Sequence, residues 1–304
     1  MKERLFAVST DSTSDIRPSY AKERDIYLTP LTFTLEQDGV IEEYFDNYDS
    51  DEEIVAFYNK VADGWFPRTA KLNYEAHMQH FRALGEAGVK VAVHFMISSG
   101  LANTVEITRQ AAQDIKAEYP DLNIYPVDPL TATVGQGMLV RLAADCRDRG
   151  MTAEETVEYL NEAKNRIQHC IIPNDLFYLK KGGRVSTLSA AFGTMLNIKP
   201  MIVFDEEGKL LVKEKNKGMK KSLHRIIEHM QAAPVAKEGY VFVVHTNNEA
   251  AANELAEMLR STLGVDVETC IMGPVIGSHV GPGSVSCSWI SEITRAELHE
   301  KLYR

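Results

Sequence analysis

The sequence predicts an α/β protein of two domains, each with mostly parallel or mixed sheets flanked by helices. Short apolar runs of the kind that form buried strands alternate with segments whose apolar residues recur every three to four positions, the period of an amphipathic helix. Strand–helix alternation favours parallel pairing. At roughly 150 residues per domain, the 304 residues of the chain suffice for two hydrophobic cores.

The apolar runs give the predicted strands, which span residues 5–8, 89–97, 124–127, 168–172, 201–204, 240–245 and 265–271. Apolar stripes predict helices over residues 105–115, 139–146 and 223–230. Capping-box spacing predicts three further helix starts, at Ser50 with Glu53, Thr152 with Glu155 and Thr294 with Glu297. Turn residues predict hairpins at 37–40 and 205–208. We expect the first domain to cover residues 1–166 and the second residues 167–304.

Composition excludes several classes of function. The chain carries 33 Lys and Arg against 43 Asp and Glu, a formal charge of −10, so a phosphate backbone would be repelled and we expect no nucleic-acid partner. Four cysteines without paired spacing predict reduced thiols and no metal site. No apolar run is long enough for a signal peptide or a membrane span. We therefore expect a cytoplasmic protein with no integral membrane segment.

Hydroxyl-rich turns follow three predicted strands, and each turn precedes a helix. They are residues 9–14, with Asp11 and Ser12, residues 98–100, with Ser98, Ser99 and Gly100, and residues 128–131. In an open α/β sheet, ligands lie beyond the carboxyl ends of the strands, where helix amides point outward. These turns would suit a carboxylate or a phosphate. The alternative is that their side chains only cap helices and form turns.

Two segments have unusual composition. Residues 273–283 combine four glycines and two prolines with one histidine, which predicts a loop that approaches a ligand closely at Gly277 and Gly281, with His279 as donor. A tight connection between strands is equally compatible. Residues 180–186 pair cations with a glycine turn and fit an anion contact, a docking edge for a partner or a solvated turn.

Several catalytic signatures are missing from the sequence: the G-x-S-x-G elbow, the P-loop and the H-E-x-x-H pair. The glycines at 135–137, followed by Val140, form only a fragment of a dinucleotide fingerprint, and close helix packing explains them better. Neither a nucleotide cofactor nor a metal is therefore expected.

Taken together, the motifs resemble the DegV family over nearly the whole chain. The motifs are DSTSD at 11–15, ISSGL at 97–101 with Thr104, GQG at 135–137, Asp175-Leu176, YLKKGGRVS at 178–186, Lys199-Pro200 and the segment 273–283. The resemblance implies a two-domain α/β carrier that holds one long-chain fatty acid in a buried tunnel, with no other cofactor. It also implies that a separate ATP-dependent fatty acid kinase converts the presented carboxylate to an acyl phosphate for phospholipid synthesis.

The resemblance also implies site residues. The family's carboxylate-binding hydroxyls would fall on Thr69 and on the Ser98-Ser99 pair, and His279 would complete the pocket. Arg184 would lie at the pocket mouth, where the kinase docks. The chain departs from the family pattern at Ala70, where a second hydroxyl is frequent, at Ala102-Asn103, which replace a frequent Ser-Gly, and at residues 215–218, which lack an expected arginine and hydroxyl.

A lipid ligand also makes physical sense. Burial contributes about 0.8 kcal/mol per methylene, whereas an unpaired buried carboxylate costs several kcal/mol, so short hydroxyls and an imidazole would be needed as donors. The main alternative is a serine hydrolase of acyl esters or thioesters, with Ser98 or Ser99 as nucleophile, His279 as base and Asp11 or Asp128 as orienting acid. A third possibility is a pure interaction protein with an acidic surface and no ligand.

Overall fold

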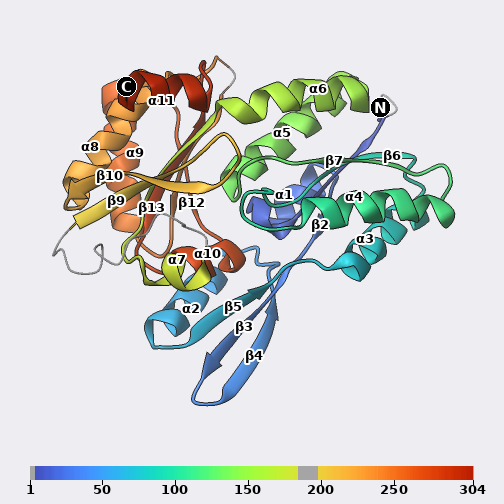
Figure 1. Cartoon of the computed structure of the whole chain (residues 1–304), viewed down its shortest axis with the longest axis horizontal. Coiled ribbons are helices and arrows are strands. Elements are labelled where there is room, and N and C mark those ends of the chain that lie inside the picture. Colours follow the sequence, from blue (N-terminus) through green and yellow to red (C-terminus); the bar gives the residue numbers. More distant parts are fainter. Residues whose placement is uncertain (1–3, 184–197, 238, 304) are drawn as a thin grey trace.

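The structure is a computed structural model that describes residues 4–183, 198–237 and 239–303 (Figure 1). Its first half contains a four-stranded sheet in the order β2-β1-β6-β7, and all neighbouring strands are parallel. The strands are β1 (Ala7–Asp11), β2 (Ile26–Thr29), β6 (Val91–Phe95) and β7 (Asn123–Val127). The α/β class predicted from the alternation of apolar runs and helical stripes is confirmed.

Helices cover both faces of this parallel sheet (Figure 1). On one face, α3 (Tyr74–Glu86) and α4 (Val105–Asp114) bury a compact apolar cluster that includes Phe81 and Ala111. On the other face lie α5 (Val134–Arg149) and α6 (Ala153–Ala163). The short helix α1 (Pro18–Glu23) joins β1 to β2.

The second half is built on a mixed sheet in the order β10-β9-β8-β13-β11-β12, in which only β11 and β12 pair in parallel. The strands are β8 (Ile167–Ile172), β9 (Ile198–Phe204), β10 (Leu210–Lys217), β11 (Val241–His245), β12 (Glu268–Ile271) and β13 (Val285–Ile290). The helices α8 (Met219–Ala232), α9 (Glu249–Leu263) and α11 (Arg295–Tyr303) pack on one face around Trp289. The other face contributes Ile171, Ile202 and Phe204 to a core shared with the first half.

The hairpin predicted at residues 37–40 forms, but it belongs to a separate antiparallel sheet instead of the parallel one. This sheet has the order β4-β3-β5 and contains β3 (Thr32–Gln37), β4 (Val40–Phe45) and β5 (Phe66–Ala70). It packs on α2 (Asp51–Ala62) through contacts such as that of Phe33 with Phe57, whose ring centroids are 5.3 Å apart. Figure 1 shows it projecting below the rest of the molecule.

The segment predicted as a glycine-rich loop is instead helical. α10 (Pro274–Val280) begins with a proline in its first turn, where the missing amide proton costs nothing. Likewise, the cations Lys180 and Lys181 lie on the short helix α7 (Phe177–Gly182), which ends at Gly183 in a left-handed conformation. The prediction of loops overlooked that glycine and proline are tolerated at helix ends.

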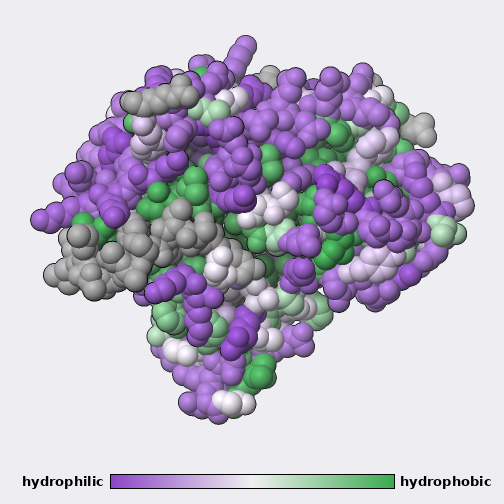
Figure 2. Space-filling model, viewed as in Figure 1, coloured by the Kyte–Doolittle hydropathy of each residue, from purple (hydrophilic) through white to green (hydrophobic). Residues whose placement is uncertain are grey.

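All three predicted capping boxes are present. Ser50 and Thr152 each accept a hydrogen bond from the amide of the glutamate three residues later, and Thr294 does the same for Glu297. Figure 2 shows a largely hydrophilic outer face, with hydrophobic residues visible mainly in recesses. Among the described residues, no helix combines the length and apolar character that crossing a bilayer requires.

Candidate ligand-binding site

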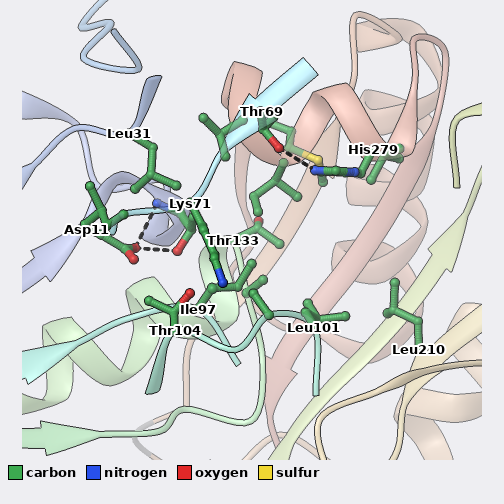
Figure 3. Close-up of a pocket in the computed structure, with 18 of the residues that line it drawn as sticks. Asp11, Leu31, Thr69, Lys71, Ile97, Leu101, Thr104, Thr133, Leu210 and His279 are labelled. Atoms are coloured by element: carbon green, nitrogen blue, oxygen red, sulfur yellow. Dashed lines mark hydrogen bonds between the residues drawn. The ribbon is translucent and has the colours of Figure 1, made fainter. Parts of the chain in front are cut away.

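A cavity of about 390 Å³ lies between the two halves of the molecule (Figure 3), within the size range of small-molecule sites. The first half contributes a mixed wall: Asp11, Thr13, Leu31, Thr69, Ala70, Lys71, Leu72, Ile97, Leu101, Ala102, Asn103, Thr104, Ala132 and Thr133. The second half contributes an almost wholly apolar wall: Ile171, Leu179, Phe204, Leu210, Met272, Val275, Ile276, His279 and Val280. An elongated apolar ligand with one polar end would fit such walls.

Thr69 and His279 meet in this cavity although 210 residues separate them. Thr69 lies near the end of β5 and His279 in the last turn of α10, and a hydrogen bond of 2.9 Å joins Thr69 Oγ1 to His279 Nε2. Helix α7 packs against the imidazole at Gly182, where a Cβ would lie 2.7 Å from Nδ1. The structure thus brings together two residues that the family resemblance assigns to one site.

Gly277 in α10 and Gly281 directly after it pack closely against aromatic side chains. A Cβ on Gly277 would lie 2.1 Å from the hydroxyl of Tyr58, and one on Gly281, whose φ is +76°, would lie 2.2 Å from the ring of Tyr178. These glycines make room for aromatic side chains of the protein itself. The expectation that they also bring the backbone close to a ligand stays a prediction.

Asp11 lines the cavity at the end of β1, while its neighbour Ser12 does not. The Asp11 Oδ1 atom accepts hydrogen bonds from the Thr13 amide at 3.1 Å, from Gln136 Nε2 at 3.0 Å and from the Thr13 hydroxyl. Burial raises the pKa of Asp11 to about 6. The Ser12 hydroxyl accepts a hydrogen bond from the Leu31 amide at 3.1 Å, so it stabilises the loop beneath the cavity.

Ser98 and Ser99 do not line the cavity. The buried Ser98 hydroxyl donates to the Gly208 carbonyl at 2.9 Å and accepts from the Gly100 amide at 3.1 Å. Ser99 is exposed, and its amide donates to Asp128 Oδ1 at 3.2 Å. The β9–β10 turn causes this arrangement, because Gly208 packs so closely that a Cβ on Gly100 would lie 2.4 Å from its carbonyl carbon.

Consequently, the hydrolase constellation is not assembled. His279 pairs with Thr69, and the Ser98 hydroxyl is bound to backbone groups. The carboxylate-binding role of Ser98 and Ser99 stays a prediction without a cavity contact. Arg184 lies outside the described residues.

Three polar residues of the cavity wall escaped the sequence reasoning: Lys71, Thr104 and Thr133. Thr104 directly precedes α4 and belongs to a motif of the family resemblance that implies no role for it. Lys71 lies two residues after Thr69 and belongs to none of the motifs. The departures Ala70, Ala102 and Asn103 also line the cavity. These three departures therefore lie on the wall contributed by the first half, whereas residues 215–218 do not line the cavity.

A buried pair of carboxyl groups lies beside the start of α10. The Gly273 amide donates to Asp15 Oδ1 at 3.1 Å. One oxygen of Asp15 and one of Asp46 are buried without a hydrogen-bond partner in the described part of the chain. Burial raises the pKa of Asp15 to about 6, and burial together with the charge of Asp15 raises that of Asp46 to about 8. Within the described ranges, no group of three or more His, Cys, Asp or Glu side chains could hold a metal ion.

The fold and the cavity define a two-part α/β protein with a largely apolar cavity between its halves, and comparisons with known proteins identify its family. The family model for DegV, described as a family of uncharacterised proteins, matches residues 5–292. The chain belongs to the DegV family. A DegV domain-containing protein of Clostridium perfringens is 33% identical to it over 95% of this chain and 98% of its own length.

Solved structures of relatives share the fold. A DegV lipid-binding protein of Thermotoga maritima is 28% identical, with a TM-score of 0.81 over 95% of this chain and 99% of its own. A DegV family protein of Thermus thermophilus, described by its fatty acid binding, is 26% identical, with a TM-score of 0.81 over 94% of this chain and 99% of its own.

Proposed function

We propose that this protein binds one long-chain fatty acid in the cavity between its two halves. The observation that carries the proposal is the cavity itself: about 390 Å³, with an apolar wall and a hydroxyl–imidazole pair at Thr69 and His279. Relatives of the same fold from Thermotoga maritima and Thermus thermophilus are described as lipid-binding and fatty-acid-binding proteins. This supports the same ligand class here.

The free energy of burying a fatty acid tail is consistent with the apolar wall of the cavity. A sixteen-carbon tail supplies on the order of 10 kcal/mol of gross transfer free energy at about 0.8 kcal/mol per buried methylene. The apolar side chains of the second half can take up this tail. The carboxylate must exchange its water for hydrogen-bond donors, and the Thr69 hydroxyl and the His279 imidazole can donate to it when they exchange their shared hydrogen bond for contacts with the ligand.

We further propose that the protein is a carrier and not itself an enzyme. In this proposal it presents the fatty acid carboxylate to a separate ATP-dependent kinase in the cytoplasm, which forms the acyl phosphate, and Arg184 contributes to kinase docking. The domain boundary after residue 166 belongs to the same proposal. Here β8 begins directly after the 3₁₀ turn Lys164–Arg166.

Extraction of the purified protein with organic solvent, followed by mass spectrometry, tests fatty-acid binding directly. We expect close to one long-chain fatty acid per chain, and saturable uptake of oleate or palmitate after the lipid is removed. A protein that yields no lipid and takes up neither acid would contradict the proposal. Labelling by a serine-directed phosphonate would instead support the hydrolase alternative.

A further inference from the structure

The cavity contains a second polar corner, separate from the pair formed by Thr69 and His279. We propose that Lys71 and the hydroxyl of Thr104, at the N-terminus of α4, bind the carboxylate of the ligand as an ion pair. The proposal rests on the fatty-acid binding proposed above and names residues that make the protein select ionised acids over neutral lipids of the same length.

Lys71 is the first observation. It is exposed, lines the cavity and follows β5 by one residue. Within the described part of the chain, no hydrogen bond or ion pair involves its side chain. Figure 3 shows the ammonium group directed toward the side of the cavity where Thr104 and Thr133 lie. An ammonium group at the edge of an apolar cavity supplies a charge that attracts an anion and strengthens its hydrogen bonds.

Thr104 is the second, independent observation. It is the N-cap residue of α4 but makes no capping hydrogen bond, unlike Ser50 and Thr152 at the starts of α2 and α6. Thr104 is 1% exposed, and its Oγ1 atom has no hydrogen-bond partner among the residues that the structure describes. A buried hydroxyl without a partner destabilises the protein, and a ligand oxygen in the cavity would remove that destabilisation.

Lys71, the Thr104 hydroxyl and the N-terminus of α4 would all stabilise an anion. The amides in the first turn of α4 have no carbonyl partner within the helix, and the positive end of the helix dipole favours an anion there. A carboxylate that accepts a hydrogen bond from Thr104 and pairs with Lys71 would use all three contributions. Thr69 and His279 share a hydrogen bond of 2.9 Å, so Lys71 and Thr104 would add to that pair a positive charge and a hydroxyl without a partner among the described residues.

The charge balance of the cavity also favours a cation that binds the ligand. Asp11 lies on the same wall, and its buried carboxyl is held by Thr13 and Gln136. A second carboxylate brought into the cavity would be repelled by Asp11 unless a positive charge offset it. Among the described side chains of the cavity wall, Lys71 is the one with a permanent positive charge.

The test measures displacement of the fluorescent fatty acid cis-parinaric acid from the delipidated full chain by oleate and by oleyl alcohol. We expect Lys71→Met to weaken oleate binding about tenfold, the usual size of one lost charge-assisted hydrogen bond. Oleyl alcohol, which carries no charge, should bind as before. Lys71→Arg should keep most of the oleate affinity. The matched control is Lys220→Met, an exposed lysine on α8 far along the chain.

Thr104 is tested by two variants with opposite expectations. Thr104→Val should lower oleate affinity severalfold while raising the melting temperature of the lipid-free protein, because it removes a buried hydroxyl without a partner. Thr104→Ser should keep the affinity. A merely structural hydroxyl would give a lower melting temperature in Thr104→Val and no change in binding.

The outcomes separate this inference from the proposed function. If the wild-type protein binds oleate and Lys71→Met binds it equally well, or loses oleate and oleyl alcohol to the same extent, the ion pair is refuted and fatty-acid binding stands. If the wild-type protein binds neither probe nor oleate, the proposed function is refuted and this inference with it. If Lys71→Met loses affinity for oleate but not for oleyl alcohol, both the ion pair and the proposed fatty-acid binding are supported.

Discussion

The two walls of the cavity differ in chemistry. The wall from the first half carries nearly all the polar groups, which follow strands or begin helices: Asp11, Thr13, Thr69, Lys71, Asn103, Thr104 and Thr133. The wall from the second half consists of apolar side chains, apart from His279. The parallel sheet directs the loops after its strands toward the cavity, and the end of β5 in the antiparallel sheet adds Thr69 and Lys71. The second half instead contributes apolar residues of β8, β9, β10, α7 and α10.

This difference between the walls predicts that substitutions on each wall affect ligand affinity differently. Changes to the apolar wall should act on the whole tail and be insensitive to the head group. Changes to the polar wall should be smaller and should depend on whether the ligand is ionised. The following variants test this division, from the largest expected effect to the smallest.

Filling the apolar wall should abolish binding. Ile276→Trp places a large ring where α10 lines the cavity, and each methylene that it excludes forfeits about 0.8 kcal/mol, so we expect at least a hundredfold loss of affinity for palmitate and for oleyl alcohol alike. Ile41→Trp on the exposed β4 is the matched control. Displacement titrations that show an unchanged affinity in Ile276→Trp would rule out this wall as the tail site.

The buried carboxyl pair beside α10 should make stability depend on pH. The pKa values of Asp15 and Asp46 are raised to about 6 and about 8, above the value of about 3.9 in an unfolded chain. The folded state therefore favours their neutral forms. This stabilisation is complete below about pH 4 and is lost as the pH rises toward 8, by on the order of a few kcal/mol in the free energy of unfolding.

Urea denaturation of Asp46→Asn between pH 4 and pH 9 measures this dependence. The variant keeps an amide in place of the carboxyl, so its free energy of unfolding should fall less with rising pH than that of the wild type. Asp49→Asn is the control, because the Ser19 amide holds the pKa of the exposed Asp49 below its usual value. Parallel curves for wild type and Asp46→Asn would disprove the role of the pair.

Removing the hydroxyl–imidazole pair should weaken binding selectively for acids. We expect Thr69→Val and His279→Gln each to lower oleate affinity about tenfold, and the double variant to lose less than the sum, because the two side chains share one hydrogen bond. Ser98→Ala, which changes a residue outside the cavity wall, should mainly affect stability. A larger loss of oleate affinity in Ser98→Ala than in Thr69→Val would reverse this assignment.

The smallest expected effect concerns chain length. Phe204 lines the main cavity and also a second cavity of about 230 Å³. Phe204→Ala should join the two volumes and shift the preferred saturated acid upward by about two to four carbons, each methylene contributing about 0.8 kcal/mol. A competition series from myristate to arachidate measures the shift, and an unchanged preference would indicate that the tail does not reach Phe204.

The sequence predicted the parts of the fold that depend on local patterns. Apolar runs predicted β1, β6, β7, β8, β9, β11 and β12 but not β2 or β13. Capping boxes at Ser50, Thr152 and Thr294 predicted three helix starts. The separate sheet formed by β3, β4 and β5 was missed, because the partner of a hairpin is set by tertiary packing such as that of Phe33 on Phe57.

The site shows the same limit. The family resemblance placed Thr69 and His279 together, which no local pattern could do across 210 residues. The positions of Ser98 and Thr104 depend on contacts distant in sequence. The Ser98 hydroxyl donates a hydrogen bond to the Gly208 carbonyl. The Thr104 hydroxyl has no hydrogen-bond partner among the described residues.

A crystal structure of the protein with an ω-bromo long-chain fatty acid would test the central claim most directly, since the anomalous signal of bromine marks the end of the tail. We expect the bromine to lie against apolar side chains of the second half. The carboxylate should be within hydrogen-bonding distance of Lys71, Thr104, Thr69 or His279. A bromine atom outside the cavity, or a carboxylate against Ile171, Phe204 and Leu210, would contradict the account.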